Sequence, residues 1–379
     1  MTPNAPMRSH ERTAKTRHRT GFLGRLHRLT SAIPGGRALK RPLLNSATAC
    51  GMTYWLSEPR PTDSFAVIMY HGVVERPNPW YGFSIPAPIL ETQLRMFRRF
   101  CSVLSLDDIF DLLDRGRPLP PRCVALTFDD GYRSSGTIAW PMLRRERLPA
   151  TLFCSVQALD HGWLWPDAVR HAIRRTSRPL LVLERLPEGR LTLPLSTLPQ
   201  RLAAVARLDM LLKRLPNAAK ERVLDELLWS LCGLTRERLV LPGLMLSWDE
   251  ARLLAAEGMD IGAHTITHPI LTNISVDEAR HEIVQSRRIL EERLRTSVPH
   301  FAYPNGTARD CSDTIRQLAR EAGFRSACMA VNGVNGPGTS LFALRRVSGV
   351  RLTVRDLVRA IVEAPRHGVQ AASRHRAAV

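Results

Sequence analysis

The sequence lacks any run of 18 apolar residues, and this excludes a membrane-spanning helix. The first 45 residues also lack the apolar segment and the small-residue cleavage site of a secretory signal, because their most hydrophobic piece, 21–26, is interrupted by Arg25. We therefore expect a cytoplasmic protein, which would lie at the membrane face if its basic segments bind lipid.

Cysteine is scarce and dispersed: the seven residues stand at positions 50, 101, 123, 154, 232, 311 and 328, with no CxxC pair. An odd, scattered set argues against a disulfide framework and against a zinc site built on cysteine. Cys101, Cys123 and Cys154 lie in apolar runs, where cysteine usually behaves as a small buried hydrophobe. We expect all seven to be structural.

Acidic residues are nearly absent from both ends of the chain. Residues 1–45 contain ten lysines and arginines against Glu11 alone, and 365–379 contain three arginines without an acid, so the ends hold +12 of the net charge of +19. Residues 1–60 are predicted to be a basic, disordered arm and 365–379 a basic tail. Such an arm is either simply solvated or contacts an anionic membrane surface. No nucleic-acid partner is expected, because no nucleic-acid-binding motif accompanies the charge.

What the chain does contain, between these ends, is a series of short apolar runs that alternate with helical patterns. The predicted strands are 65–70, 101–106, 123–128, 150–154, 259–263, 300–303, 326–330 and 344–347. Most are continuously apolar, which is typical of strands buried on both faces of a parallel sheet. Three helices are predicted to begin at the capping sequences of Ser105, Ser247 and Ser275. The pattern predicts an α/β fold, a distorted (β/α) barrel, with an open doubly wound sheet as the alternative.

The alternation lapses between about residues 160 and 242, where the sequence is rich in leucine and arginine. Helices are predicted here at 201–215 and 220–231. We interpret this segment as a helical insertion in one domain that covers residues 61–364.

Two adjacent carboxylates follow the predicted strand 123–128. Asp129 and Asp130 come directly after apolar residues, and Gly131 allows a sharp turn just behind them. Adjacent acids are costly unless a cation or a proton shares them, so one would bind a metal and the other would act as a base. The alternative is a solvated Asp-Gly turn.

A pair of histidines, His264 and His268, follows the predicted strand 259–263. With one aspartate they would form a ligand set that leaves open positions for water and substrate on a divalent metal. A third segment, FAYPNG at 301–306, again follows a strand, and its Phe301 and Tyr303 either line the substrate site or belong to the core.

The motifs TFDDGY (127–132), HTITHP (264–269) and FAYPNG together resemble those of the polysaccharide deacetylases of carbohydrate esterase family 4, with the NodB-homology fold. The resemblance covers about residues 64–363. It implies a distorted (β/α) barrel, Asp129 as the catalytic base, and Asp130, His264 and His268 as ligands of a divalent metal, commonly zinc. The implied substrate partner is an N-acetylated glycan.

The chain departs from the commonest pattern of that family in two ways. The third motif lacks its usual arginine, and no Leu-x-His motif follows it. Met69-Tyr-His-Gly-Val73 instead resembles the circularly permuted branch, in which this histidine is the general acid. That role is therefore expected of His71, with a buried, backbone-bonded histidine as the alternative.

The predicted function is hydrolysis of N-acetyl groups on the amino sugars of a polysaccharide or oligosaccharide. Substrate contacts are expected from Tyr132, Phe301, Tyr303 and Asn305. The competing hypotheses are an inactive sugar-binding homologue and an amidohydrolase that acts on a small non-sugar amide. A cytoplasmic location would favour the precursor of a surface polysaccharide as substrate.

Overall fold

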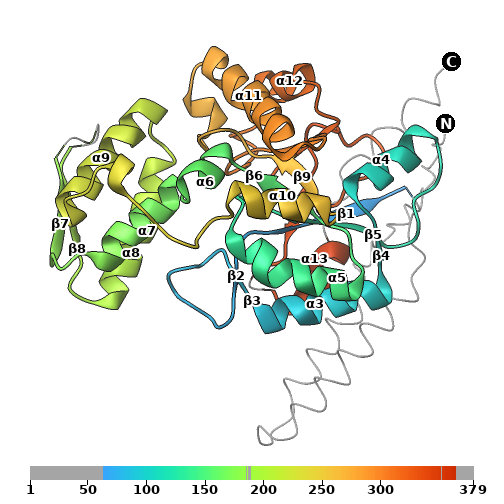
Figure 1. The fold of residues 1–379 in the computed structure, drawn as a ribbon, viewed down its shortest axis with the longest axis horizontal. Helices are drawn as coiled ribbons and strands as arrows, with labels where there is room; N and C mark the ends of the chain where they lie inside the picture. Colours follow the sequence, from blue (N-terminus) through green and yellow to red (C-terminus); the bar gives the residue numbers. More distant parts are fainter. Residues whose placement is uncertain (1–62, 185, 187–188, 351, 364–379) are drawn as a thin grey trace, which may run out of the picture. The chain divides into compact units, whose positions relative to one another are not determined.

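The structure, a computed structural model, describes residues 63–184, 186, 189–350 and 352–363 (Figure 1). The predicted basic arm, 1–60, and the basic tail, 365–379, lie outside the described residues. Within the part that is described, no helix has both the length and the apolar character needed to cross a bilayer.

A parallel sheet of eight strands forms the centre of the fold. Seven of them follow one another in the spatial order β11 (Ser326–Cys328), β10 (His300–Ala302), β9 (Asp260–Ala263), β6 (Thr151–Cys154), β5 (Cys123–Phe128), β1 (Phe65–Tyr70) and β12 (Arg346–Ser348). The eighth, β4 (Ser102–Val103), pairs with the first half of β5. Seven of the eight predicted runs contain one of these strands, and the eighth, 344–347, overlaps β12, which ends one residue later.

The sheet curls into a nearly closed ring. The backbone just before β12 forms hydrogen bonds with the backbone of β11, the strand at the opposite end of the sheet. The Leu344 N–H donates to the Ala327 carbonyl at 3.0 Å, and the Met329 N–H donates to the Leu344 carbonyl at 2.8 Å. The predicted distorted (β/α) barrel is confirmed, and the alternative of an open sheet is wrong.

Both faces of the barrel strands are buried, which explains their continuous apolar sequences. Along β1, Ile68 packs between the sheet and the outer helices, whereas its neighbour Val67 packs inside the barrel. On β5, Leu126 likewise packs against the outer helices, and its neighbour Ala125 packs inside the barrel. The interior is a filled core and not a channel.

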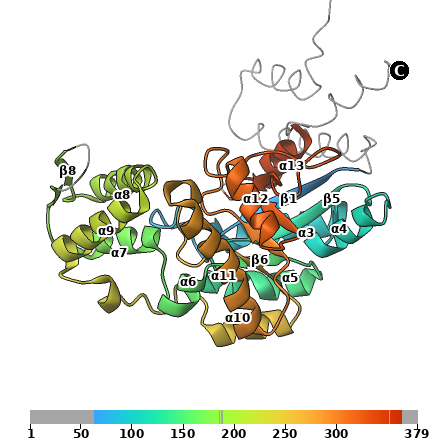
Figure 2. The ribbon, with the colours of Figure 1, turned by 90° about the horizontal axis from the view of Figure 1, so that it is seen from above.

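Helices cover the outside of the barrel (Figure 2). They are α3 (Ala87–Phe100), α5 (Trp140–Glu146), α6 (Val156–His161), α10 (Trp248–Ala256), α11 (Val276–Leu294), α12 (Asp313–Glu321) and α13 (Val354–Glu363). The buried side chains of α4 (Leu106–Asp114) pack instead with the residues of the barrel interior. The predicted caps of α4, α10 and α11 are confirmed, since the hydroxyls of Ser105, Ser247 and Ser275 each accept a bond from the N–H three residues on. Short elements complete this part: β2 (Val73–Val74) paired with β3 (Ile85–Pro86), a π-helical turn at Ser135–Ala139, and 3-10 turns at Arg236–Arg238 and Leu271–Asn273.

The segment interpreted as an insertion has a hydrophobic core of its own. It contains α7 (Trp165–Arg175), α8 (Leu198–Leu212) and α9 (Asn217–Cys232), which Figure 1 shows together at one side of the barrel. It also contains an antiparallel pair, β7 (Leu180–Leu183) and β8 (Leu191–Pro194), that was not predicted. Asn273 ties this segment to the barrel by donating to the carbonyls of Lys213 and Leu215 at 3.0 and 3.1 Å.

Candidate metal centre and active site

The carboxyl ends of the parallel strands bring the predicted site residues to one edge of the barrel. His71 follows β1, Asp129 and Asp130 follow β5, and His264 follows β9. These four residues, together with His268 of the loop after β9, line a pocket of about 220 Å³.

The backbone at this edge is held in the left-handed region at residues other than glycine. The φ angle is 78° at Asp130, 65° at Thr265 and 58° at His268. Such conformations are costly for residues with a Cβ and are retained where the surrounding structure enforces them, most often at functional sites. Gly131, with φ of 88°, continues the turn at no such cost.

Asp130, His264 and His268 form a cluster that could hold a metal ion. One ligand atom from each lies within 4.8 Å of the others, and no second group of this kind occurs in the described part of the chain. Asp130 Oδ1 lies 3.4 Å from Nε2 of His264 and 3.3 Å from Nε2 of His268.

The hydrogen bonds of the two histidines fit a cation at this point. Nδ1 of His264 lies 2.6 Å from the Ala302 carbonyl, to which it would donate, and this leaves Nε2 with a free lone pair. His268 is buried, and neither of its ring nitrogens has a hydrogen-bond partner. Since buried polar atoms are nearly always paired, the unpartnered nitrogens are consistent with a metal ligand. One carboxylate with two imidazoles is a donor set that zinc accepts.

The pKa shifts of the three cluster residues differ in direction. Burial raises the pKa of Asp130, but the adjacent imidazoles of His264 and His268 outweigh it and hold the pKa well below its ordinary value. Burial opposes protonation of His264, yet Asp130 and Asp129 outweigh it and raise the pKa of this histidine. Burial lowers the pKa of His268, which keeps that ring neutral, as metal binding requires.

Asp129 is held by a fully buried arginine that was not predicted. Nη1 and Nη2 of Arg346 donate to its two carboxylate oxygens at 2.7 and 2.8 Å. Burial raises the pKa of Asp129, but the charges of Arg346, His264 and His71 outweigh it and lower the pKa below its ordinary value. Asp129 is therefore a buried carboxylate that stays ionised. The signal in the sequence was the pair Arg345 and Arg346 inside the predicted strand 344–347, since a charge that is buried in a strand needs a partner.

His71 lines the pocket, with its side chain 21% exposed and Nε2 4.0 Å from Asp129 Oδ2. Its Nδ1 has no hydrogen-bond partner. The alternative of a backbone-bonded core histidine does not fit this environment.

Three of the four predicted substrate-contact residues line the pocket: Tyr132, Tyr303 and Asn305. The hydroxyl of Tyr132 donates to Asp167 at 3.0 Å, that of Tyr303 donates to the Phe342 carbonyl, and Nδ2 of Asn305 donates to Asp310. Phe301 does not belong to this group. Its side chain is fully buried between the sheet and the outer helices, so it packs the core.

The insertion supplies one wall of the same pocket, through Trp165, Pro166, Arg170, Asp209 and Lys213. None of these residues was predicted to lie at the site, because no motif marks them in the sequence.

Glu282 of α11 holds the loop that carries the second histidine. Its Oε2 accepts from the N–H groups of Ile266 and Thr267 at 2.7 and 3.0 Å, and its Oε1 accepts from the Thr267 hydroxyl at 2.6 Å. These bonds fix the backbone between His264 and His268, where the strained φ angles occur.

Replacing Glu282 by alanine is expected to weaken zinc binding by about 10–100-fold, because supporting residues outside the ligand set typically contribute that much to metal affinity. Glu282→Gln keeps an acceptor for both N–H groups and should lose less. The measurement is competition for zinc with a chromophoric chelator. The control is Glu292→Ala, an exposed glutamate on the same helix. Equal affinities in Glu282→Ala and the control would show that Glu282 does not position the loop.

Comparison with known proteins identifies the family. A family profile described as "Polysaccharide deacetylase" matches residues 116–178 and 213–327. The chain belongs to the polysaccharide deacetylase family. The profile covers the strands that carry Asp129, Asp130, His264 and His268, and it leaves out residues 179–212 of the insertion.

The similar proteins differ in the share of their own length that this chain matches. It is 32% identical over 94 residues to the poly-beta-1,6-N-acetyl-D-glucosamine N-deacetylase of Escherichia coli K12, a match that spans 24% of this chain and only 14% of that relative. The deacetylase PplD of Streptococcus pyogenes, solved with acetate, has a similar structure with a TM-score of 0.54 at 16% identity, over 80% of this chain and 99% of that one. IcaB from Ammonifex degensii gives a TM-score of 0.51 at 17% identity, over 79% and 97%. At these identities the two structures support the fold.

Proposed function

We propose that this deacetylase-family chain is a metal-dependent hydrolase that removes N-acetyl groups from the amino sugars of a polysaccharide or oligosaccharide. The observation that carries the proposal is a buried, ionised Asp129 in the same pocket as the Asp130, His264 and His268 cluster. A base beside a metal-ligand set can activate water and polarise the carbonyl for hydrolysis of an unactivated amide. The name of the Escherichia coli relative supports a poly-N-acetylglucosamine as the type of substrate.

Asp130, His264 and His268 would hold the metal, for which zinc is our proposal. A divalent ion at such a set polarises an amide carbonyl and lowers the pKa of bound water. Asp129 would take a proton from the attacking water, and Arg346 would keep this carboxylate ionised and correctly oriented. Backbone N–H groups near Tyr132 or Asn305 would stabilise negative charge on the acetyl oxygen.

His71 would protonate the departing amine, because an amide nitrogen leaves poorly without a proton. Its position in the wall of the pocket, close to Asp129, supports this role. The assignment of the chain to the permuted branch of the family rests on the same residue.

The role of His71 predicts a dependence on the leaving group. His71→Gln should lower the rate of acetate release from N-acetylglucosamine oligomers by about 10²–10⁴-fold, the contribution typical of a general acid. The rate with 4-nitrophenyl acetate should change far less, because a nitrophenolate departs without a proton. Steady-state kinetics on the two substrates measure the difference. His161→Gln, at an exposed histidine, is the control. Equal losses on both substrates would contradict the assignment of His71 as the acid.

Two other functions make different predictions. An inactive sugar-binding homologue would bind glycans and release no acetate, and an amidohydrolase for small amides would prefer short non-sugar amides to oligosaccharides. The ionised base and the metal-ligand set in one pocket favour the deacetylase over the first. Acetate release from neutral N-acetylglucosamine oligomers, compared with small N-acetyl amides, tests the second. We also propose that the protein lies in the cytoplasm and that its basic arm contacts lipid.

A further inference from the structure

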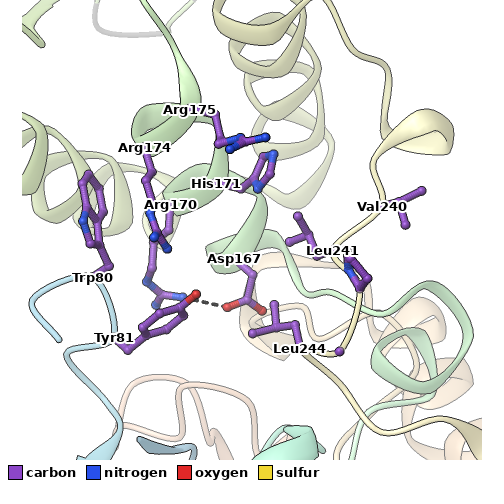
Figure 3. Close-up of a pocket in the computed structure, with 12 residues that line it drawn as sticks. Trp80, Tyr81, Asp167, Arg170, His171, Arg174, Arg175, Val240, Leu241 and Leu244 are labelled. Carbon is purple, nitrogen blue, oxygen red and sulfur yellow. Dashed lines mark hydrogen bonds and ion pairs between the residues drawn. The ribbon is translucent and has the colours of Figure 1, made fainter. Parts of the chain in front are cut away.

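A second pocket, of about 380 Å³, lies on the insertion side of the barrel and is not used by the proposed reaction (Figure 3). Its volume is in the range of small-molecule sites. Helix α7 provides one wall with Arg170, His171, Arg174 and Arg175, and the loop between β2 and β3 provides Trp80 and Tyr81. Residues 240–244 close the remaining side.

This pocket carries positive charge that is not neutralised within the described residues. Arg174 and Arg175 are exposed, and no carboxylate of the described part of the chain forms an ion pair with either. Asp167 is the sole acid among the lining residues, and it is already engaged by Arg170 at 2.9 Å and by the Tyr132 hydroxyl at 3.0 Å. Two guanidinium groups therefore remain available to a ligand.

His171, which also lines this pocket, is affected by the same charge. Burial lowers the pKa of His171, and the positive charges of Arg175 and Arg174 lower it further. His171 is thus neutral near pH 7 and can donate or accept a hydrogen bond beside the two arginines.

The second pocket adjoins the active-site pocket through shared residues. Arg170 lines both of them. Tyr132 lines the active-site pocket and bonds to Asp167, which lines the second. Arg170 and Arg174 are four residues apart on α7, so they lie on one face of the helix. The second pocket is therefore a neighbour of the active-site pocket along α7, with Arg170 in the wall of both.

We propose that this pocket is a subsite for a negatively charged group of the glycan, next to the sugar that is deacetylated. Arg174 would bind the carboxylate of an acidic sugar or a phosphate, since a guanidinium group pairs with either through two parallel hydrogen bonds. Arg175, which points to the other side of α7 in Figure 3, would add its positive charge to the same pocket. Trp80 and Tyr81 would pack against the apolar face of the sugar ring that carries the charge. The inference rests on the proposed deacetylase function and extends it from neutral to anionic glycans.

The test compares zinc-loaded wild type with the double variant Arg174→Gln/Arg175→Gln. The substrates are a hyaluronan hexasaccharide, which alternates N-acetylglucosamine with glucuronic acid, UDP-N-acetylglucosamine, which carries a diphosphate, and neutral chitohexaose. The variant should raise KM for at least one anionic substrate by about tenfold, the equivalent of one charge-assisted contact. Its KM for chitohexaose should change less than about threefold, and added salt should weaken only the anionic interaction. Arg178→Gln, an exposed arginine just beyond α7 that does not line the pocket, is the control.

The outcomes separate the two proposals. A larger effect on the hexasaccharide assigns the pocket to an acidic sugar, and a larger effect on UDP-N-acetylglucosamine assigns it to a phosphate. Equal KM values for wild type and double variant on both anionic substrates overturn the subsite while the deacetylase function stands. If no glycan releases acetate, calorimetry still measures binding of the hexasaccharide. A loss of affinity confined to the double variant supports the subsite, although the deacetylase proposal fails. Unchanged affinity in the double variant overturns the subsite.

Discussion

Replacing Asp129 by asparagine is expected to lower acetate release from an N-acetylglucosamine oligomer by about 10²–10⁴-fold, the range for a lost general base. Asparagine has nearly the same shape, but its amide cannot take a proton from water. Asp129 lies beside the metal-ligand cluster and is not part of it, so zinc binding should be largely retained.

The kinetic measurement is therefore paired with a zinc titration of the same variant. Asp277→Asn, at an exposed aspartate in the first turn of α11, is the matched control and should have wild-type turnover. Thermal unfolding shows whether Asp129→Asn remains folded. A folded, zinc-binding variant with wild-type turnover would exclude Asp129 as the base.

Replacing Arg346 by methionine is expected to lower the free energy of unfolding by about 3–5 kcal/mol, the cost of breaking a buried ion pair from one side. The methionine leaves the buried carboxylate of Asp129 without its two guanidinium bonds. It also removes the donor to the Met329 carbonyl, which Nε of Arg346 contacts at 2.9 Å.

A double-mutant cycle distinguishes the loss of this pair from a general packing defect. Asp129→Asn combined with Arg346→Met removes both charges, so the double variant should be less destabilised than the sum of the single variants by more than about 1 kcal/mol. Urea unfolding measures all four proteins. Arg346→Lys keeps a charge without the paired bonds and should fall between wild type and Arg346→Met. Additive effects would contradict an energetic coupling between Asp129 and Arg346.

The barrel could be predicted from the sequence because its strands are marked locally. A strand buried on both faces is apolar at most positions, so runs such as 65–70 and 123–128 are identified with both ends correct. The insertion was harder to predict in detail. Its strand β7 is a continuous apolar run, but it is short and lies in a leucine-rich segment that was interpreted as helical. Strand β8 is only partly buried, and its residues give no continuous apolar signal.

The same contrast holds for the site. Asp129, Asp130, His264 and His268 each follow a strand within motifs, and the parallel sheet brings strand ends to one edge. Arg346 pairs with an aspartate 217 residues away in the sequence, and no local pattern specifies that contact. Nothing in the sequence distinguishes Glu282 from the other charged residues of its helix, because its contact with the loop between His264 and His268 arises only in the folded chain. Phe301 was misplaced because side chains alternate along β10, so that Phe301 faces the outer helices while Ala302 faces the barrel interior.

The central claim is that hydrolysis depends on one metal ion held by Asp130, His264 and His268. Its most direct test is to titrate zinc into chelator-treated protein while acetate release from chitohexaose is recorded. We expect no acetate from the metal-free protein and a rate that rises to a plateau at one zinc per chain. Acetate release by the metal-free protein at the rate of the zinc-loaded protein would contradict the account.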